Sequence, residues 1–339
     1  MSKLFEVTIE VTQQCPNKCI YCSSMSSPDK IGALDFNTIC QCVDDAANMG
    51  AKLINLSGGE PMLRPDIAQI ANYIHNKGLK IRLYCSGIYY DGSYRTMPIE
   101  LLQSIKGKVD NLIFNYESCS PQLYSKIMGT PPGNLALLED TIKNAIQLGI
   151  TVEAHLVPMK CNFRQIPETL TKLYSLGVTN ISLLRLVHQG RVEENEDDVV
   201  LSEDEDQELK TMFVELSQKY EKTKLRLGKP YRSEKFVTCN TGTVRLVVRY
   251  DGFVYPCGAF KDGMEEYRGC KPDNVKDKRL ADIYETSEYL AKVRKDLEKY
   301  YEHEVTEPCF GQFCRKLIES NSYQPASQLP VVSFLEQKM

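Results

Sequence analysis

The chain has 339 residues, of which 42% are hydrophobic and 25% are charged, and its formal net charge at pH 7 is -4. This length and hydrophobic content suffice for one large globular domain and a smaller one. The weak negative charge excludes the basic surface expected of a nucleic-acid-binding protein, so we expect no nucleic acid as a partner.

The N-terminal segment contains no apolar run of signal-peptide length, and no later window reaches the length of a membrane span. We therefore expect a cytoplasmic protein without a membrane partner. In that reducing compartment, the thirteen cysteines are expected to serve as metal ligands, catalytic thiols or core residues rather than in disulfides.

Strand-like and helix-like segments alternate over the first part of the chain. Strands are predicted at residues 4–11, 52–56, 81–85, 111–116, 152–157 and 180–184, with helices between them at 35–48, 65–76, 98–105, 135–148 and 167–176. Four of these helices end at a glycine just before the next strand: Gly50, Gly78, Gly149 and Gly177. This alternation predicts an α/β fold whose parallel sheet curls into an open or closed barrel.

The organisation changes after residue 191. An acidic run is followed by the capping box Ser202-x-x-Glu205, which opens a helix to about residue 220. Beyond residue 224 the sequence predicts a hairpin and a helix over about 281–301. We expect a barrel at 1–191, an acidic linker and helix at 192–223, a second, cysteine-rich domain at 224–319, and an extended tail at 320–339.

Three cysteines follow the first strand within eight residues, in the pattern C-x3-C-x2-C: Cys15, Cys19 and Cys22. Their thiolates are expected to meet at a metal. An iron–sulfur cubane usually takes four cysteines, so a local set of three either borrows a fourth or leaves one iron open to a non-protein ligand. The alternative is zinc, but zinc motifs normally pair cysteines or add histidines, and no histidine lies near this segment.

A second motif, Gly58-Gly59-Glu60-Pro61, follows the second strand. Ligand sites in βα architectures collect at the carboxyl ends of the strands, so we expect this motif and the cysteines at the same end of the sheet. The glycines let the backbone approach a ligand, and Glu60 and nearby carbonyl groups can accept hydrogen bonds from an ammonium group. Taken alone, the motif also suits a tight turn.

The two motifs together, with Tyr21 before the last cysteine, resemble the radical S-adenosylmethionine superfamily. The resemblance implies a partial (β/α)6 barrel in which the three cysteines bind a [4Fe-4S] cluster and S-adenosylmethionine occupies the open iron. It also implies an electron donor such as flavodoxin or ferredoxin. The residues implied to contact S-adenosylmethionine are Tyr21, Gly58, Gly59, Glu60 and Pro61 and, after later strands, Ser86, Asn115, Glu117 and Arg185.

Other residues at that end of the barrel are further candidates for a role at the site. Cys119 is the candidate catalytic residue, as a thiol that donates hydrogen to a substrate radical; the alternative is a half-buried thiol without a role. His155 lies in an apolar strand and is expected to be a hydrogen-bonded packing residue. The segment Gln189-Gly190-Arg191 follows the sixth strand, where this family contacts its cosubstrate or substrate.

The last five cysteines lie in the second domain. Cys239 and Cys257 follow the pattern C-x12-G-x4-C and are expected on one hairpin, and Cys309 and Cys314 follow the long helix. This order resembles the SPASM/twitch extension of the superfamily. Its full form needs about seven ligands for two clusters, so these four cysteines, with Cys270 as a spare, imply one auxiliary [4Fe-4S] cluster. A zinc ribbon is the alternative.

The resemblance implies an enzyme that cleaves S-adenosylmethionine reductively to a 5′-deoxyadenosyl radical, which abstracts a hydrogen atom from a substrate. The first expectation for that substrate is a ribosomal peptide, so that the protein is a peptide maturase. The second is a small polar metabolite, such as an amino sugar, that is oxidised or rearranged. A non-catalytic iron–sulfur scaffold is the third hypothesis, and it predicts that no 5′-deoxyadenosine forms.

Overall fold

The computed structural model describes residues 4–220, 224–227, 239–300 and 309–319. Within these residues the main sheet has nine strands in the order β11-β10-β1-β2-β3-β6-β7-β8-β9. Neighbouring strands pair in parallel from β10 to β9, and only β10 and β11 pair in antiparallel orientation.

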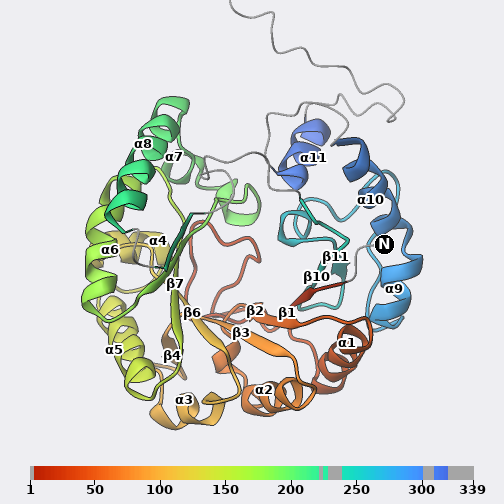
Figure 1. The fold of residues 1–339 in the computed structure, drawn as a ribbon, viewed down its shortest axis with the longest axis horizontal. Coiled ribbons are helices and arrows are strands. Elements are labelled where there is room, and N and C mark those ends of the chain that lie inside the picture. The colour runs from red at the N-terminus through yellow and green to blue at the C-terminus, as the bar shows by residue number, and fades with distance from the viewer. Residues whose placement is uncertain (1–3, 221–223, 228–238, 301–308, 320–339) are drawn as a thin grey trace, which may run out of the picture.

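Six of these strands are the ones expected from the alternation. They are β1 (Glu6–Thr12), β2 (Leu53–Gly58), β3 (Lys80–Cys85), β6 (Asn111–Asn115), β7 (Val152–Leu156) and β8 (Asn180–Leu183). The helices between them are α1 (Phe36–Asn48), α2 (Ile67–Asn76), α3 (Ile99–Ile105), α4 (Pro121–Met128), α5 (Asn134–Gln147) and α6 (Ile166–Ser175). In Figure 1 the helices form an outer ring around the strands, and the loop after β1 runs into the middle of the ring. The partial (β/α)6 barrel is confirmed.

Local signals in the sequence fix where these elements begin and end. The Asp35 carboxylate caps α1 by accepting a hydrogen bond from the Thr38 amide at 2.9 Å. The four glycines expected to end helices have φ angles of 88° (Gly50), 71° (Gly78), 76° (Gly149) and 88° (Gly177). The left-handed conformation at these turns favours glycine, which explains why the sequence marks these helix ends so clearly.

The barrel strands have one aliphatic face and one polar face. The face toward the helices carries fully buried residues such as Val7, Ile9, Ile54 and Leu56. The face toward the barrel axis carries Thr8, Glu10, Asn55, Arg82, Tyr84, Asn111, Asn115, Glu153, His155, Asn180 and Ser182. A barrel interior that only packs is filled mainly by branched apolar side chains. This polar interior is therefore suited to bind polar groups.

Several elements were not expected from the sequence. A small hairpin, β4 (Ile88–Tyr90) and β5 (Tyr94–Thr96), follows β3, and helix α4 precedes α5. After α7 (Glu196–Val199) and α8 (Glu203–Lys219), strand β9 (Lys224–Leu227) pairs in parallel with β8. The alternation of strands and helices therefore extends to residue 227 rather than ending near residue 191. The capping box of Ser202 and Glu205 at the start of α8 is confirmed.

The C-terminal part of the chain is attached to the first strand of the barrel. The expected hairpin is present as β10 (Arg245–Val248) and β11 (Val254–Tyr255), and β10 pairs in parallel with β1. Three helices follow: α9 (Leu280–Thr286), α10 (Glu288–Tyr300) and α11 (Phe310–Glu319). The single helix expected over 281–301 is thus two helices, because Ser287 between them has an extended backbone. The expected tail at 320–339 lies outside the described residues.

Two further expectations concern disulfides and membrane-spanning helices. All thirteen cysteines lie in the described part of the chain, and none of them forms a disulfide there. Among the helices of that part, none is long and apolar enough to span a membrane.

Candidate active site

The cysteine loop, residues 13–34, leaves the carboxyl end of β1 and carries Cys15, Cys19 and Cys22. The Cys15 amide donates to the Ser27 carbonyl at 3.1 Å, and the Cys22 amide donates to the Cys19 carbonyl at 3.2 Å. Burial raises the pKa of Cys15 and of Cys19, and negative charge on a neighbouring thiol raises each further, Cys19 acting on Cys15 and Cys22 on Cys19. The raised pKa values of Cys15 and Cys19 suit a site where bound metal supplies the compensating positive charge.

The glycine motif lies directly against this loop. The Gly59 amide donates to the Thr12 carbonyl at 2.7 Å, and the Glu60 amide donates to the Gln14 carbonyl at 2.7 Å. A Cβ atom at Gly58 would lie 2.2 Å from the Thr12 oxygen, and one at Gly59 would lie 2.1 Å from the Gln14 oxygen. The two glycines are needed because the end of β2 runs beside the backbone that carries the cysteines.

The Glu60 side chain links two strand ends. It is fully buried, and its carboxylate accepts hydrogen bonds from the Met62 amide at 2.9 Å and from the Ser86 amide. Burial raises the pKa of this carboxyl group, although the hydrogen bonds from Ser86 and Met62 lower it in part. Glu60 thus positions Ser86 relative to the glycine motif, and both of its oxygens already have protein partners.

Three of the residues expected to contact S-adenosylmethionine form one hydrogen-bonded group, the Tyr21 cluster, made of Tyr21, Asn115 and Glu117. The Tyr21 hydroxyl donates to Glu117 Oε1 at 2.6 Å, and Asn115 Nδ2 donates to the Tyr21 hydroxyl at 3.2 Å. The Val157 amide donates to Glu117 Oε2 at 2.7 Å. Burial raises the pKa of Glu117 to about 7. These contacts bring the cysteine loop, β6 and the end of β7 together.

The contacts of Cys119 and Arg185 do not test the roles that the sequence suggests for them. Cys119 is partly buried, and the nearby Tyr116 donates from its hydroxyl to Glu139 on α5 at 2.8 Å. In the described residues no hydrogen bond joins Cys119 to the Tyr21 cluster. Arg185 lies after β8 and is partly exposed. The roles expected for both residues stay predictions.

His155 belongs to a polar network inside the barrel. Its Nε2 lies 2.8 Å from Glu153 Oε1, and the same carboxylate accepts hydrogen bonds from Ser182 Oγ at 3.0 Å and from Arg226. Burial alone would raise the pKa of Glu153, but the hydrogen bonds from His155 and Arg226 lower it to about 2. With Nε2 committed to an ionised carboxylate, Nδ1 of the buried ring has no hydrogen-bond partner among the described residues.

The auxiliary cysteines also converge. Burial raises the pKa of Cys257 to about 12, and negative charges on Cys309 and Cys239 add to this effect. The pKa of Cys314 is raised by burial, and Cys309 is again among the neighbours that act on it. Cys270 instead lies with its sulfur 3.5 Å from Glu288 Oε2. Electrostatic interactions thus link Cys239 and Cys309 to Cys257, and Cys309 to Cys314, and the choice of these four cysteines over Cys270 stays a prediction.

The sequence did not reveal how the cysteine loop is held from the other side of the barrel. Arg191, which is only 4% exposed, donates from Nε to the Cys19 carbonyl at 2.6 Å and from Nη2 to the Ser26 carbonyl at 2.7 Å. Its own amide donates to the Cys22 carbonyl at 3.2 Å. The only signal for this role was the glycine that precedes it, since a Cβ at Gly190 would lie 2.5 Å from the Cys22 oxygen.

No group of three His, Cys, Asp or Glu side chains in the described residues lies close enough to hold a single metal ion. A cubane does not require that arrangement, because each thiolate binds a different iron. The thiols of the cysteine loop and those of the C-terminal domain fit clusters of this kind by the chemistry of their donor atoms.

Comparison with known proteins bears on both the cysteine loop and the auxiliary cysteines. The sequence model described as the Radical SAM superfamily matches residues 9–173, which include the cysteine loop and the glycine motif. A second model, described as an iron-sulfur cluster-binding domain (SPASM), matches residues 239–311, which include Cys239, Cys257 and Cys309. The chain belongs to the radical SAM superfamily. It is an enzyme that uses S-adenosylmethionine and a [4Fe-4S] cluster, and its C-terminal domain binds auxiliary iron–sulfur.

Relatives with two kinds of name are similar to this chain. A probable GTP 3′,8-cyclase from Methanococcus maripaludis is 27% identical over 74% of this radical SAM chain and 83% of its own length. The PqqA peptide cyclase of Ruegeria pomeroyi is 25% identical over 81% of this chain and 72% of its own. Among solved structures, Streptococcus suis SuiB bound to its precursor peptide SuiA has a TM-score of 0.69 at 16% identity, covering 87% of this chain and 67% of SuiB. That likeness concerns the fold.

Proposed function

We propose that this radical SAM enzyme is a maturase that modifies a ribosomally made peptide. The observation that carries the proposal is the likeness to PqqA peptide cyclase, which spans both the barrel and the auxiliary domain. When bound and reduced, the cluster and S-adenosylmethionine supply a 5′-deoxyadenosyl radical that abstracts a hydrogen atom. A low-potential protein such as flavodoxin or ferredoxin is the proposed electron donor.

Each motif has a proposed task in binding these groups. Cys15, Cys19 and Cys22 hold the cluster that binds S-adenosylmethionine. The backbone of Gly58 and Gly59, held by the buried Glu60 and by Pro61, receives the amino group of the cosubstrate. The residues proposed to line the rest of its site are Tyr21, Ser86, Asn115, Glu117 and Arg185. Cys239, Cys257, Cys309 and Cys314 hold one auxiliary cluster.

A second candidate substrate is a small polar molecule, and two observations favour it. One is the likeness to GTP 3′,8-cyclases, whose name gives a nucleotide as substrate. The other is the set of buried acceptors on the barrel interior that have no hydrogen-bond partner among the described residues: Glu10 Oε2, Asn55 Oδ1 and Asn180 Oδ1. Because all three are acceptors, the group that enters the barrel is expected to bring N–H or O–H donors.

One experiment separates the two substrates. The anaerobically reconstituted, reduced enzyme is incubated with S-adenosylmethionine and either a short peptide encoded beside its gene or a panel of nucleotides and amino sugars. We expect the peptide alone to raise 5′-deoxyadenosine formation and to change in mass. Stimulation by a nucleotide or an amino sugar, with the peptide unchanged, would reject the maturase proposal in favour of the second candidate.

A further inference from the structure

The two cysteine sites are joined by hydrogen bonds that pass through a short segment after β8. This segment, Gln189–Arg191, lies between the cysteine loop and the auxiliary loop, defined as residues 257–265. Arg191 and Gly190 contact the cysteine loop at the carbonyl groups of Cys19, Cys22 and Ser26, as described above. The C-terminal end of this segment therefore contacts the loop that carries Cys15, Cys19 and Cys22.

The other end of the segment contacts the auxiliary site. Gln189 is 1% exposed, and its Nε2 donates to the Gly258 carbonyl, directly after Cys257. Its Oε1 accepts a hydrogen bond from Arg315, directly after Cys314, at 3.4 Å. Arg315 also donates to the Asp262 carbonyl and, at 3.1 Å, to the Glu193 carboxylate. One buried amide therefore contacts residues adjacent to two auxiliary cysteines.

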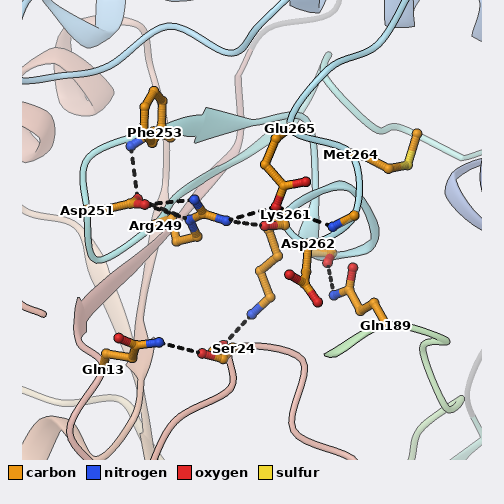
Figure 2. A network of polar contacts seen from close by, with 12 residues as sticks. Gln13, Ser24, Gln189, Arg249, Asp251, Phe253, Lys261, Asp262, Met264 and Glu265 are labelled. Atoms are coloured by element: carbon orange, nitrogen blue, oxygen red, sulfur yellow. Dashed lines mark hydrogen bonds and ion pairs between the residues drawn. The ribbon is translucent and has the colours of Figure 1, made fainter. Parts of the chain in front are cut away.

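A second set of hydrogen bonds connects the auxiliary loop with the cysteine loop, and Figure 2 shows it from close by. Lys261 of the auxiliary loop is 7% exposed and donates from Nζ to Ser24 Oγ at 2.6 Å and to the Glu10 carboxylate. Ser24 follows Cys22 by two residues, and its carbonyl accepts a hydrogen bond from Gln13 at 3.1 Å. Arg249 holds the auxiliary loop in place by donating to the Lys261 carbonyl.

We propose that Gln189, Gly190 and Arg191, together with Lys261, form a brace through which the auxiliary site positions the cysteine loop. Gln189 and Lys261 are then positioning residues for the cluster that binds S-adenosylmethionine, because their hydrogen bonds go to residues beside the cysteines and not to the cysteine thiols. The physical reason is that buried hydrogen bonds with charged or fully enclosed partners are costly to break, so a change in one loop is passed to the other. The brace does not depend on which substrate the enzyme modifies.

The test is a mutant cycle on the full-length, anaerobically reconstituted enzyme. Removing the auxiliary cluster with Cys257→Ala and Cys309→Ala is expected to speed amide hydrogen exchange in residues 15–27 by about tenfold, the effect of losing roughly one buried hydrogen bond. Gln189→Leu with Lys261→Met is expected to give a similar increase. In the variant that combines all four substitutions, Gln189→Leu and Lys261→Met are expected to cause no further increase in exchange, because loss of the auxiliary cluster has already broken the brace.

Controls separate this effect from general loss of structure. Lys126→Met removes an exposed ion pair with Asp198 and is expected to leave exchange in residues 15–27 unchanged. Lys261→Arg keeps a charged donor and is expected to retain most of the wild-type protection. The electron paramagnetic resonance spectrum of the reduced N-terminal cluster is expected to change in Gln189→Leu and to keep the wild-type form in Lys126→Met. Unchanged exchange after loss of the auxiliary cluster, or fully additive effects, would overturn the proposal.

Discussion

The carboxyl group of Glu117 is the clearest case in which burial changes the chemistry of a single residue. The side chain is 1% exposed and accepts hydrogen bonds from Tyr21 and from the Val157 amide. These two bonds favour the charged form, but burial outweighs them and raises the pKa to about 7. Glu117 therefore exchanges its proton near neutral pH, where a normal glutamate is fully ionised.

This shift predicts a dependence of stability on pH. In the unfolded chain Glu117 titrates near pH 4.3, so between about pH 4.3 and 7 the folded state binds more protons than the unfolded state. Its stabilising contribution is complete below the unfolded pKa and is lost as pH rises through the folded pKa. Relative to Glu117→Gln, the free energy of unfolding of the wild type should fall by on the order of 3 kcal/mol from about pH 4 to pH 8.

Urea unfolding of both metal-free proteins across that pH range measures the difference, and the other titrating groups cancel in the comparison. Parallel curves for the wild type and Glu117→Gln would show that the carboxyl group has an ordinary pKa.

At the scale of elements, the junction between β1 and β2 has the most restricted backbone of the site. Gly58 has a φ angle of 121° and is the last residue of β2 that pairs with β1. The pairing register shifts just before it, between Glu10 and Thr12 of β1. The cysteine loop can leave β1 at this point only because the glycine backbone lies beside the Thr12 carbonyl. The geometry of the loop therefore depends on a strand that contributes no cysteine.

Two glycine substitutions separate close packing from backbone strain. Gly58→Ala places a Cβ atom 2.2 Å from a backbone oxygen that cannot move freely, whereas Gly78 has a φ angle of 71° and nothing within 4 Å. We expect Gly78→Ala to cost about 1 kcal/mol, from the left-handed conformation alone, and Gly58→Ala to cost more than about 3 kcal/mol. Chemical denaturation of the two variants makes the comparison, and equal losses would contradict the packing argument.

At the scale of the whole molecule, the C-terminal domain is continuous with the barrel. Strand β10 pairs with β1, and Arg279 binds the buried Asp45 of α1, with Arg279 Nε 3.0 Å from Asp45 Oδ2. The auxiliary cysteines are therefore fixed relative to the strand from which the first three cysteines extend. The prediction that the protein binds two separate clusters can be tested by measuring its iron content.

We expect the triple variant Cys15→Ala, Cys19→Ala, Cys22→Ala to retain about one cubane, or about four irons per chain, because the four auxiliary cysteines are untouched. In that background Cys270→Ser should leave the iron content unchanged, since Cys270 lies against Glu288. Cys257→Ser in the same background should remove most of the iron. Anaerobic iron and sulfide analysis measures all three, and loss of iron in the Cys270 variant would assign that cysteine to the cluster.

The sequence by itself determined six of the barrel strands and most of the helices between them, their glycine stops and caps, the radical SAM family and both groups of cysteines. These features depend on local spacing, on backbone conformation at single residues and on motifs of a few residues, all of which are visible along the chain. It could not determine that Glu60 is committed to backbone amides, that Arg191 and Lys261 contact the cysteine loop, or that the Cys270 sulfur lies beside Glu288. Only the tertiary structure decided these points, because each depends on contacts between residues far apart in sequence: Arg191 meets Cys19, and Lys261 meets Ser24, only after the barrel has closed around its polar interior.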